Sequence, residues 1–243
     1  MKLTWLGQAG LLLETANATV MMDPYLTDSI ADRLGEDYSR LVPLREEYLS
    51  HKPDVILLSH DHTDHLDVAS LQHLLPQDRK VLVLAGANAW KKARESVGGP
   101  HNYVQMEPGT EWTTGDIHIR AVRAVHSDPT AVGFVITAEG KCLYATGDTL
   151  YSQAVIDQIQ VPVDVLVTVV NGQGNNMNGT DAARLAKAVN PKIAIPVHWG
   201  LFKKYADTPD EFVKGCRKYG VTERVLSIYQ RADVDELLKG ASL

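Results

Sequence analysis

The chain has 243 residues, of which 44% are hydrophobic and 22% charged, a composition typical of a packed globular protein. This length is ample for a hydrophobic core, and we expect a single domain spanning residues 1–243. The formal net charge of −6 argues against a broad nucleic-acid-binding face, because binding a phosphate backbone requires clustered Lys and Arg.

The two cysteines, Cys142 and Cys216, provide no disulfide framework, which favours a reducing compartment. Residues 1–3 run directly into a predicted strand without the apolar stretch of a signal peptide, and no segment has the length needed to cross a bilayer. We therefore expect a cytoplasmic protein with no membrane partner, which acts on a small molecule and could form homo-oligomers.

The chain opens with three predicted strands at 3–6, 10–15 and 19–23, which form an antiparallel meander. Asp23 ends the third strand, directly before Pro24. Metal-ligating histidines usually donate their second N–H to a carboxylate or a carbonyl, so Asp23 is a candidate to orient a metal ligand. A plain turn residue before proline explains Asp23 equally well.

Residues 26–50 are polar and rich in charge, with Arg33, Arg40 and Arg45 among acidic neighbours, so they are not expected to form core. They form either a lid or a solvated helical excursion. Long connections in compact domains tend to be functional or disordered, and length alone does not decide between these interpretations.

An apolar run at 55–58 predicts a short buried strand, and the loop that leaves its carboxyl end is rich in metal-binding side chains. The loop carries four potential ligands: His60, His62, Asp64 and His65. One turn cannot easily direct all four at a single ion, so the spacing suits two adjacent ions. The alternatives are a solvated polar loop, or a helix cap in which Asp67 starts a helix at 68–75. We expect Asp67 to cap that helix, but a cap uses one acidic residue and explains none of the three histidines.

The rest of the chain alternates between helical and extended patterns, which indicates an α/β protein with parallel strands. Predicted strands span 81–84, 103–106, 111–114, 117–125, 131–138, 141–145, 163–170, 192–197 and 224–228. Predicted helices span 88–97, 152–158, 182–189 and 209–219, and a last helix begins at Asp233.

A weak internal repeat links the two halves of the chain. The strand at 10–16 and the strand ending at Asp23 are echoed by 133–138 and a strand ending near Asp148. Each copy is a strand, a tight turn, a second strand and an acidic terminus. The echo fits two sheets built on one plan, although any two hairpins look alike at this level.

A glycine- and amide-rich loop at 171–179 follows the predicted strand at 163–170. Its side chains, including Asn171, Asn175 and Asn176, could hydrogen-bond substrate hydroxyls or a carbonyl. The next helix, capped by Thr180 or Asp181, has backbone N–H groups able to hold an anion, which makes Thr180 a further candidate for substrate binding. Ordinary loop composition would also produce this pattern.

The form His-x-His-x-Asp-His behind a buried strand resembles the signature of the metallo-β-lactamase-fold hydrolases. Within that superfamily the chain is most similar to the ascorbate-6-phosphate lactonase branch, through residues 5–10, 146–149 and 190–198. The resemblance implies an α/β (α+β) fold in which two sheets and their helices form a four-layer αββα sandwich, with the site along the edge where both sheets present strand ends.

The resemblance also implies further ligands at strand ends, and the chain supplies His126, Asp148 and His198 in these places. The expected arrangement gives one ion His60, His62 and His126, gives the other Asp64, His65 and His198, and lets Asp148 bridge both. Such donors suit zinc, manganese or iron, and sequence does not choose among them. The lactonase resemblance points to manganese and the wider superfamily to zinc.

The expected activity is hydrolysis of a lactone of an acidic or phosphorylated sugar by a metal-bound hydroxide, with Asp64 and Asp148 orienting the nucleophile and moving protons. Three alternatives remain: a metal-dependent phosphodiesterase, an iron redox enzyme and a metal-binding scaffold without catalysis. Lys203 and Lys204 follow His198 closely and are candidates to bind an anionic substrate group, unless they are simply a solvated pair.

Overall fold

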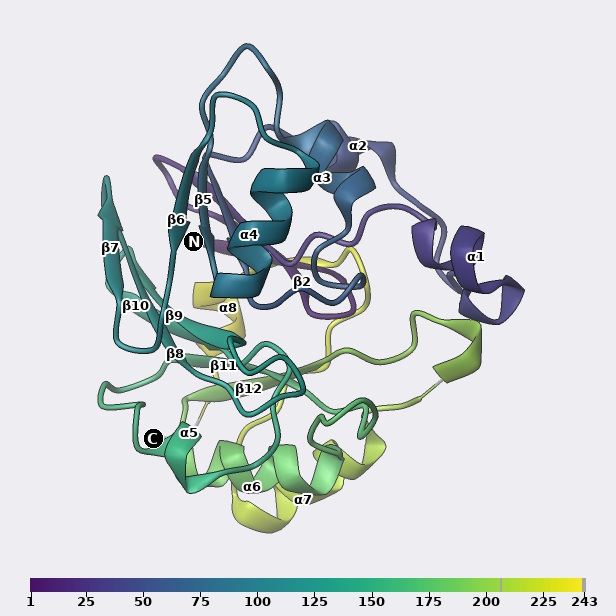
Figure 1. Cartoon of the computed structure of the whole chain (residues 1–243). Coiled ribbons are helices and arrows are strands. Elements are labelled where there is room, and N and C mark those ends of the chain that lie inside the picture. The colour runs from purple at the N-terminus through teal and green to yellow at the C-terminus, as the bar shows by residue number, and fades with distance from the viewer. Residues whose placement is uncertain (206, 242–243) are drawn as a thin grey trace.

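The computed structural model describes residues 1–205 and 207–241 and contains two β-sheets, which face each other across a hydrophobic interior (Figure 1). The first sheet has the order β13 (Arg231–Asp233), β1 (Lys2–Gly7), β2 (Gly10–Glu14), β3 (Thr19–Met22), β4 (Val55–Leu58), β5 (Leu82–Ala85) and β6 (Asn102–Gln105). The second has the order β12 (Ile193–Val197), β11 (Val165–Val169), β10 (Lys141–Ala145), β9 (Val132–Ala138), β8 (Ile117–Arg123) and β7 (Glu111–Thr114).

The two sheets share one pairing plan, as the internal repeat predicted. In the first sheet β1, β2 and β3 pair antiparallel, and β3, β4 and β5 continue in parallel. In the second sheet β8, β9 and β10 pair antiparallel, and β10, β11 and β12 continue in parallel. The end of β3 and the end of β10 therefore occupy equivalent places, which puts Asp23 and Asp148 at corresponding strand ends.

Strand β4 is buried on both faces, and this explains its unbroken aliphatic sequence. Because successive side chains of a strand point to opposite faces, Val55 and Leu57 join the interior between the sheets, whereas Ile56 and Leu58 pack against the outer helices. The strand is thereby fixed in register, and so is the position of the loop that follows it.

Helices cover the outer faces of both sheets and complete a four-layer αββα sandwich. Helices α3 (Val68–Leu74) and α4 (Ala87–Ser96) lie on the first sheet, and α6 (Gly179–Val189) and α7 (Asp210–Tyr219) lie on the second, as Figure 1 shows. The short helices are α5 (Gln153–Ile156) and α8 (Val234–Leu238). Within the described residues, every helix is too short or too polar to cross a membrane.

Residues 26–50 form a helical excursion, which contains α1 (Ser29–Leu34), the 3-10 helix η1 (Glu36–Tyr38) and α2 (Glu46–Leu49). It docks on the segment around η2 (Lys203–Tyr205), which follows β12. The backbone N–H of Leu41 donates to the carbonyl of Leu201 at 2.7 Å, and Arg40 and Phe202 form a β-bridge. The excursion is thus attached to the chain just beyond His198.

Two local predictions were wrong. No strand forms at 224–228: Glu223 makes one bridge to Ala194 on β12, after which the chain leaves that edge with Val225 exposed, and the last strand is β13 instead. Helix α6 is capped by neither Thr180 nor Asp181. Asn178 caps it, because the Asn178 side chain accepts the N–H of Asp181 at 2.9 Å.

The predicted cap of α3 is confirmed, since the side chain of Asp67 accepts the backbone N–H of Ser70 at 3.2 Å. The same carboxylate also accepts hydrogen bonds from the hydroxyl groups of Thr27 and Ser29. Asp67 therefore ties the start of the helical excursion to the loop that carries the histidines.

Candidate metal centre

The carboxyl ends of four strands bring the seven predicted ligands to one edge of the sandwich. The loop after β4 carries four of them, and His126, Asp148 and His198 follow β8, β10 and β12. They form two groups. In each group every residue offers one potential ligand atom, and these atoms all lie within 4.8 Å of one another. The groups are His60, His62, His126 and Asp148, and then Asp64, His65 and His198.

Asp148 lies between the two groups and turns one carboxylate oxygen toward each. Its Oδ1 is 3.2 Å from Nε2 of His65 and 3.4 Å from Nε2 of His198, both in the second group. Its Oδ2 is 3.8 Å from Nε2 of His126, in the first group. This placement suits a carboxylate shared by two cations.

Within each group, imidazole nitrogens converge in the manner of ligands to a common ion. Nδ1 of His62 lies 3.2 Å from Nε2 of His126, and Nε2 of His65 lies 3.3 Å from Nε2 of His198. Nε2 of His60 is buried and has no hydrogen-bond partner among the described residues. Buried polar atoms are normally satisfied, so an orphaned nitrogen beside three other donors fits a metal ligand.

The charges at the site also favour cations. Burial lowers the pKa of His60 well below its ordinary value, which keeps the imidazole neutral and able to bind a metal. Burial acts in the same direction on His65, but the carboxylates of Asp148 and Asp64 outweigh it and raise the pKa of His65 well above the ordinary value. Two carboxylates so close together require nearby positive charge, which divalent ions would supply.

Asp23 lies directly behind the metal-binding loop, fully buried and in the left-handed backbone region with φ of 43°. Its carboxylate accepts the backbone N–H and the hydroxyl of Ser59, and lies 2.8 Å from Nδ1 of His65. Because a carboxylate only accepts hydrogen bonds, Nδ1 of His65 carries the proton and Nε2 is left free to bind a metal. The structure therefore places Asp23 beside Nδ1 of His65, in a position to orient that imidazole.

Gln8 is a site residue that the sequence analysis did not single out. It lies in the tight turn between β1 and β2, almost completely buried, and its Nε2 donates to Oδ2 of Asp64 at 2.9 Å. Its backbone carbonyl accepts the N–H of His198 at 2.8 Å. The sequence feature that could have pointed to Gln8 is its position: a polar residue beside Gly7, in a turn between two strongly apolar strands.

Some residues of the glycine- and amide-rich loop at 171–179 contribute to the site. Nδ2 of Asn176 donates to Oδ2 of Asp148 at 2.7 Å, and Asn176 is largely buried. Asn171 lines the adjacent cavity. Asn175 instead exposes its side chain and faces His126 through its backbone carbonyl, at 3.2 Å from Nδ1. Thr180 is exposed on α6 and does not line that cavity.

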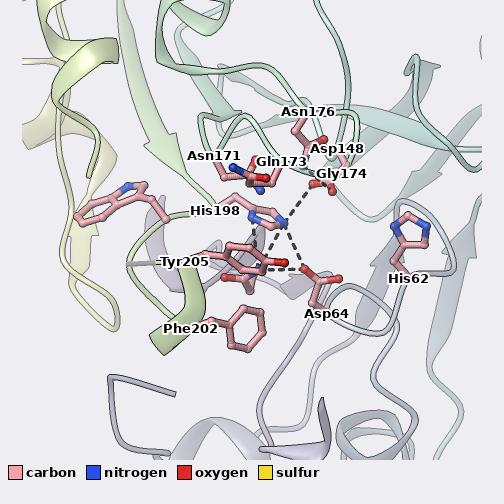
Figure 2. Close-up of a pocket in the computed structure, with 12 residues that line it drawn as sticks. His62, Asp64, Asp148, Asn171, Gln173, Gly174, Asn176, His198, Phe202 and Tyr205 are labelled. Carbon is pink, nitrogen blue, oxygen red and sulfur yellow. Dashed lines mark hydrogen bonds and ion pairs between the residues drawn. The ribbon is translucent and has the colours of Figure 1, made fainter. Parts of the chain in front are cut away.

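A cavity of about 150 Å³ opens over the ligands, and Figure 2 shows residues that line it. Asp64, Asp148 and His198 form its floor, and amide side chains from the loop at 171–179 lie on one side. On the opposite side are the aromatic rings of Phe202 and Tyr205. A substrate here meets the candidate ligands, polar amides and an aromatic wall together.

Lys203 and Lys204 are not brought into this cavity. Nζ of Lys203 forms an ion pair with Glu36 at 2.7 Å, and Nζ of Lys204 donates to the hydroxyl of Tyr38 at the same distance. Both partners belong to the helical excursion. In the structure the two lysines thus attach that segment to η2, and their predicted contact with substrate stays a prediction.

Comparison with known proteins agrees with this fold. A family model described as a beta-lactamase superfamily domain matches residues 2–198. The UPF0173 protein of Pyrococcus furiosus is 30% identical over 226 residues, covering 90% of this chain and 91% of the relative. The UPF0173 metal-dependent hydrolase of Carboxydothermus hydrogenoformans is 30% identical over 241 residues, covering 93% of this chain and 97% of the relative.

The fold also has experimental counterparts. The structure of a metallo hydrolase from Ignicoccus hospitalis superposes with a TM-score of 0.74 at 20% identity, covering 95% of this chain and 97% of the other. At that identity the likeness supports the fold alone. The family model spans most of the chain and the two curated relatives span nearly all of it, so the chain belongs to the beta-lactamase superfamily and, within it, to the UPF0173 metal-dependent hydrolase family.

Proposed function

We propose that this hydrolase uses two divalent metal ions to open a lactone of an acidic or phosphorylated sugar. The observation that supports two ions most strongly is the position of Asp148, whose two carboxylate oxygens face different ligand groups. Histidine and aspartate donors without cysteine suit manganese or zinc, which we propose as the bound metals, and they are also compatible with iron.

When bound, the two ions would lower the pKa of a water molecule and polarise the substrate carbonyl. The residues of the chain position the reacting groups. Asp64 and Asp148 each have one oxygen held by an amide, from Gln8 and Asn176 respectively, so neither carboxylate is free to rotate. Carboxylates fixed in this way can orient the attacking water and carry a proton to the departing oxygen.

The size and lining of the cavity support a compact, polar reacting group. Its volume of about 150 Å³ is below the roughly 300–1,000 Å³ of sites for drug-sized ligands, so the reacting group is small. Asn171 and Gln173 on one wall present amides suited to the hydroxyl groups of a sugar, while Phe202 and Tyr205 on the other offer apolar surface. A lactone ring fits the size and lining of this cavity.

The proposal is tested by elemental analysis of untagged protein together with turnover of a lactone panel and of bis-aryl phosphates. We expect two ions per chain, hydrolysis of sugar lactones, and loss of that activity when a chelator removes the metal. One ion per chain at saturating metal would contradict the shared carboxylate. Turnover of phosphodiesters but not lactones would assign a phosphodiesterase, and a coloured iron protein with neither activity would point to redox chemistry.

A further inference from the structure

A second cavity, of about 420 Å³, adjoins the first and is the basis of this inference. The two cavities share four lining residues: His62, Asp64, Phe202 and Tyr205. The second cavity extends away from Asp148 to the helical excursion, which supplies Ile30, Arg33, Leu34 and Tyr38 to its wall. A substrate reacting in the first cavity can therefore continue past the two aromatic rings into the second.

Helix α1 turns one face toward the second cavity. Ile30, Arg33 and Leu34 are spaced i, i+3 and i+4, which places them on the same side of the helix. Leu34 is 51% exposed and Ile30 is buried, so the face presents the apolar side chain of Leu34 beside the guanidinium group of Arg33. Such a face is suited to a ligand that has both a carbon skeleton and an anionic group.

The guanidinium of Arg33 is held beside the metal-binding loop but is largely free to bind. Its Nη2 donates to Oγ1 of Thr63 at 3.1 Å, and Thr63 stands between two candidate ligands. Among the described residues no carboxylate pairs with Arg33, whereas Arg45, Arg79 and Arg184 form ion pairs at 3.5, 3.3 and 2.8 Å. Most of its five N–H donors therefore remain available to a ligand.

We propose that Arg33 binds an anionic group, a carboxylate or a phosphate, at the end of the substrate remote from the reacting bond. This inference rests on the proposed function and specifies where the charge of the acidic sugar is recognised. Arg33 binds such groups through two parallel N–H donors. Lys203 and Lys204, which the sequence suggested for this role, line neither cavity.

Acidic residues also border the second cavity and must be considered. Asp64 belongs to a candidate ligand group, so a bound metal ion would balance its charge. Asp61 would repel an anion, but Nζ of Lys92 donates to the Asp61 backbone carbonyl and brings a positive charge to the same loop. The side of the cavity toward Arg33 is therefore the part that favours an anion.

The test measures binding affinity by isothermal titration calorimetry. Manganese-loaded protein is titrated with three product-like acids that differ at one end. Gluconate has no second anionic group, 6-phosphogluconate carries a phosphate, and glucarate carries a carboxylate. We expect at least one of the doubly anionic probes to bind about 10- to 100-fold tighter than gluconate, as one charge-assisted contact provides. Comparing the phosphate and carboxylate arms identifies which anion Arg33 prefers.

Arg33→Ala is expected to bring the affinities for the doubly anionic probes down to about that for gluconate, and Arg33→Lys to retain part of the preference. Arg45→Ala is the matched control, because it removes an arginine from the same excursion but outside both cavities. An undiminished preference in Arg33→Ala, or no preference in the wild-type protein, would overturn the proposal. Turnover of uncharged lactones tests the proposed function separately, so the two can fail independently.

Discussion

The side-chain amide of Gln8, in the first turn of the chain, donates to Oδ2 of Asp64 at 2.9 Å and so connects the first hairpin to the metal-binding loop. Gln8 adopts a left-handed conformation with φ of 46°, which the turn between β1 and β2 requires. Its carbonyl also holds the backbone of His198. Gln8 therefore positions both Asp64 and His198, which belong to the same ligand group but lie far apart in the sequence.

Gln8→Ala should weaken metal binding in the group that contains Asp64, His65 and His198. The variant keeps the backbone contact to His198 but leaves Asp64 without its amide donor, and loss of such a partner typically reduces metal affinity about 10- to 100-fold. Competition with a chelator measures the effect. Gln173→Ala removes an amide that, among the described residues, bonds no ligand carboxylate, and it should retain wild-type metal affinity. Equal affinities of the two variants would show that Gln8 does not position Asp64.

Asp23→Asn should change the tautomer of His65. The new amide places an N–H donor against Nδ1, which favours the proton on Nε2, the atom that faces Asp148. Because a protonated nitrogen cannot bind a metal, we expect metal content to fall from two ions per chain toward one, measured by elemental analysis, with nitrogen NMR reporting the tautomer.

Asp67→Asn is the matched control for that substitution. Asp67 is also buried and accepts several hydrogen bonds, but none comes from a histidine. We expect it to lower the stability of the protein while metal content stays at two ions per chain. Two ions of normal affinity in Asp23→Asn would disprove the role assigned to Asp23.

Asp148→Asn should leave the fold intact and remove most activity, because a neutral amide bridges two cations poorly. The loss should exceed the roughly 10- to 100-fold that removal of an outer partner costs. Asn176→Ala removes such a partner, the donor to Oδ2 of Asp148, and should cause the smaller loss. Circular dichroism and turnover of a sugar lactone are the measurements. Near-normal turnover of Asp148→Asn would exclude Asp148 as the bridge.

Cys216 should make the protein less stable as pH rises above about 9. The thiol is fully buried, and burial raises its pKa from 9.0 to about 12. Between these values the unfolded chain loses the proton while the folded chain keeps it, so the unfolded state binds fewer protons and the free energy of unfolding falls with pH. This contribution is fully present below pH 9.

Urea unfolding at pH 8, 10 and 11 measures that dependence, and Cys216→Ala should show a shallower decline than the wild-type protein. Other buried groups with a raised pKa, such as Tyr144, are present in both proteins, so their contributions to the pH dependence cancel in the comparison. Identical slopes would mean that Cys216 does not titrate with a raised pKa. The same burial predicts slow alkylation of native Cys216 at pH 8, because the thiolate is the reactive form.

The sequence by itself determined most of the strands and the candidate ligands that follow them. The aliphatic run at 55–58 could only be buried, and the ligand-rich loop behind it was visible because side chains in one turn are neighbours in sequence. The two similar hairpins predicted two sheets built on one plan. The structure agrees, because the strands from β1 through β5 follow the same order of pairing as those from β8 through β12. The prediction of a strand at 224–228 was wrong. The hydrophobic pattern of a segment shows that it could form a strand, but not whether a sheet edge is available for it to pair with.

Only the tertiary structure decided which polar residues surround the ligands. Gln8 and Asp64 are 56 positions apart, and Asn176 meets Asp148 across 28, so no local pattern relates them. The tertiary structure also decided which cations line a cavity: Lys203 and Lys204 are close to His198 in sequence but bond to the excursion, whereas Arg33 lines the second cavity. Sequence distance fails here because helix α1 turns one face to the metal-binding loop, and that docking depends on contacts between segments far apart in the chain.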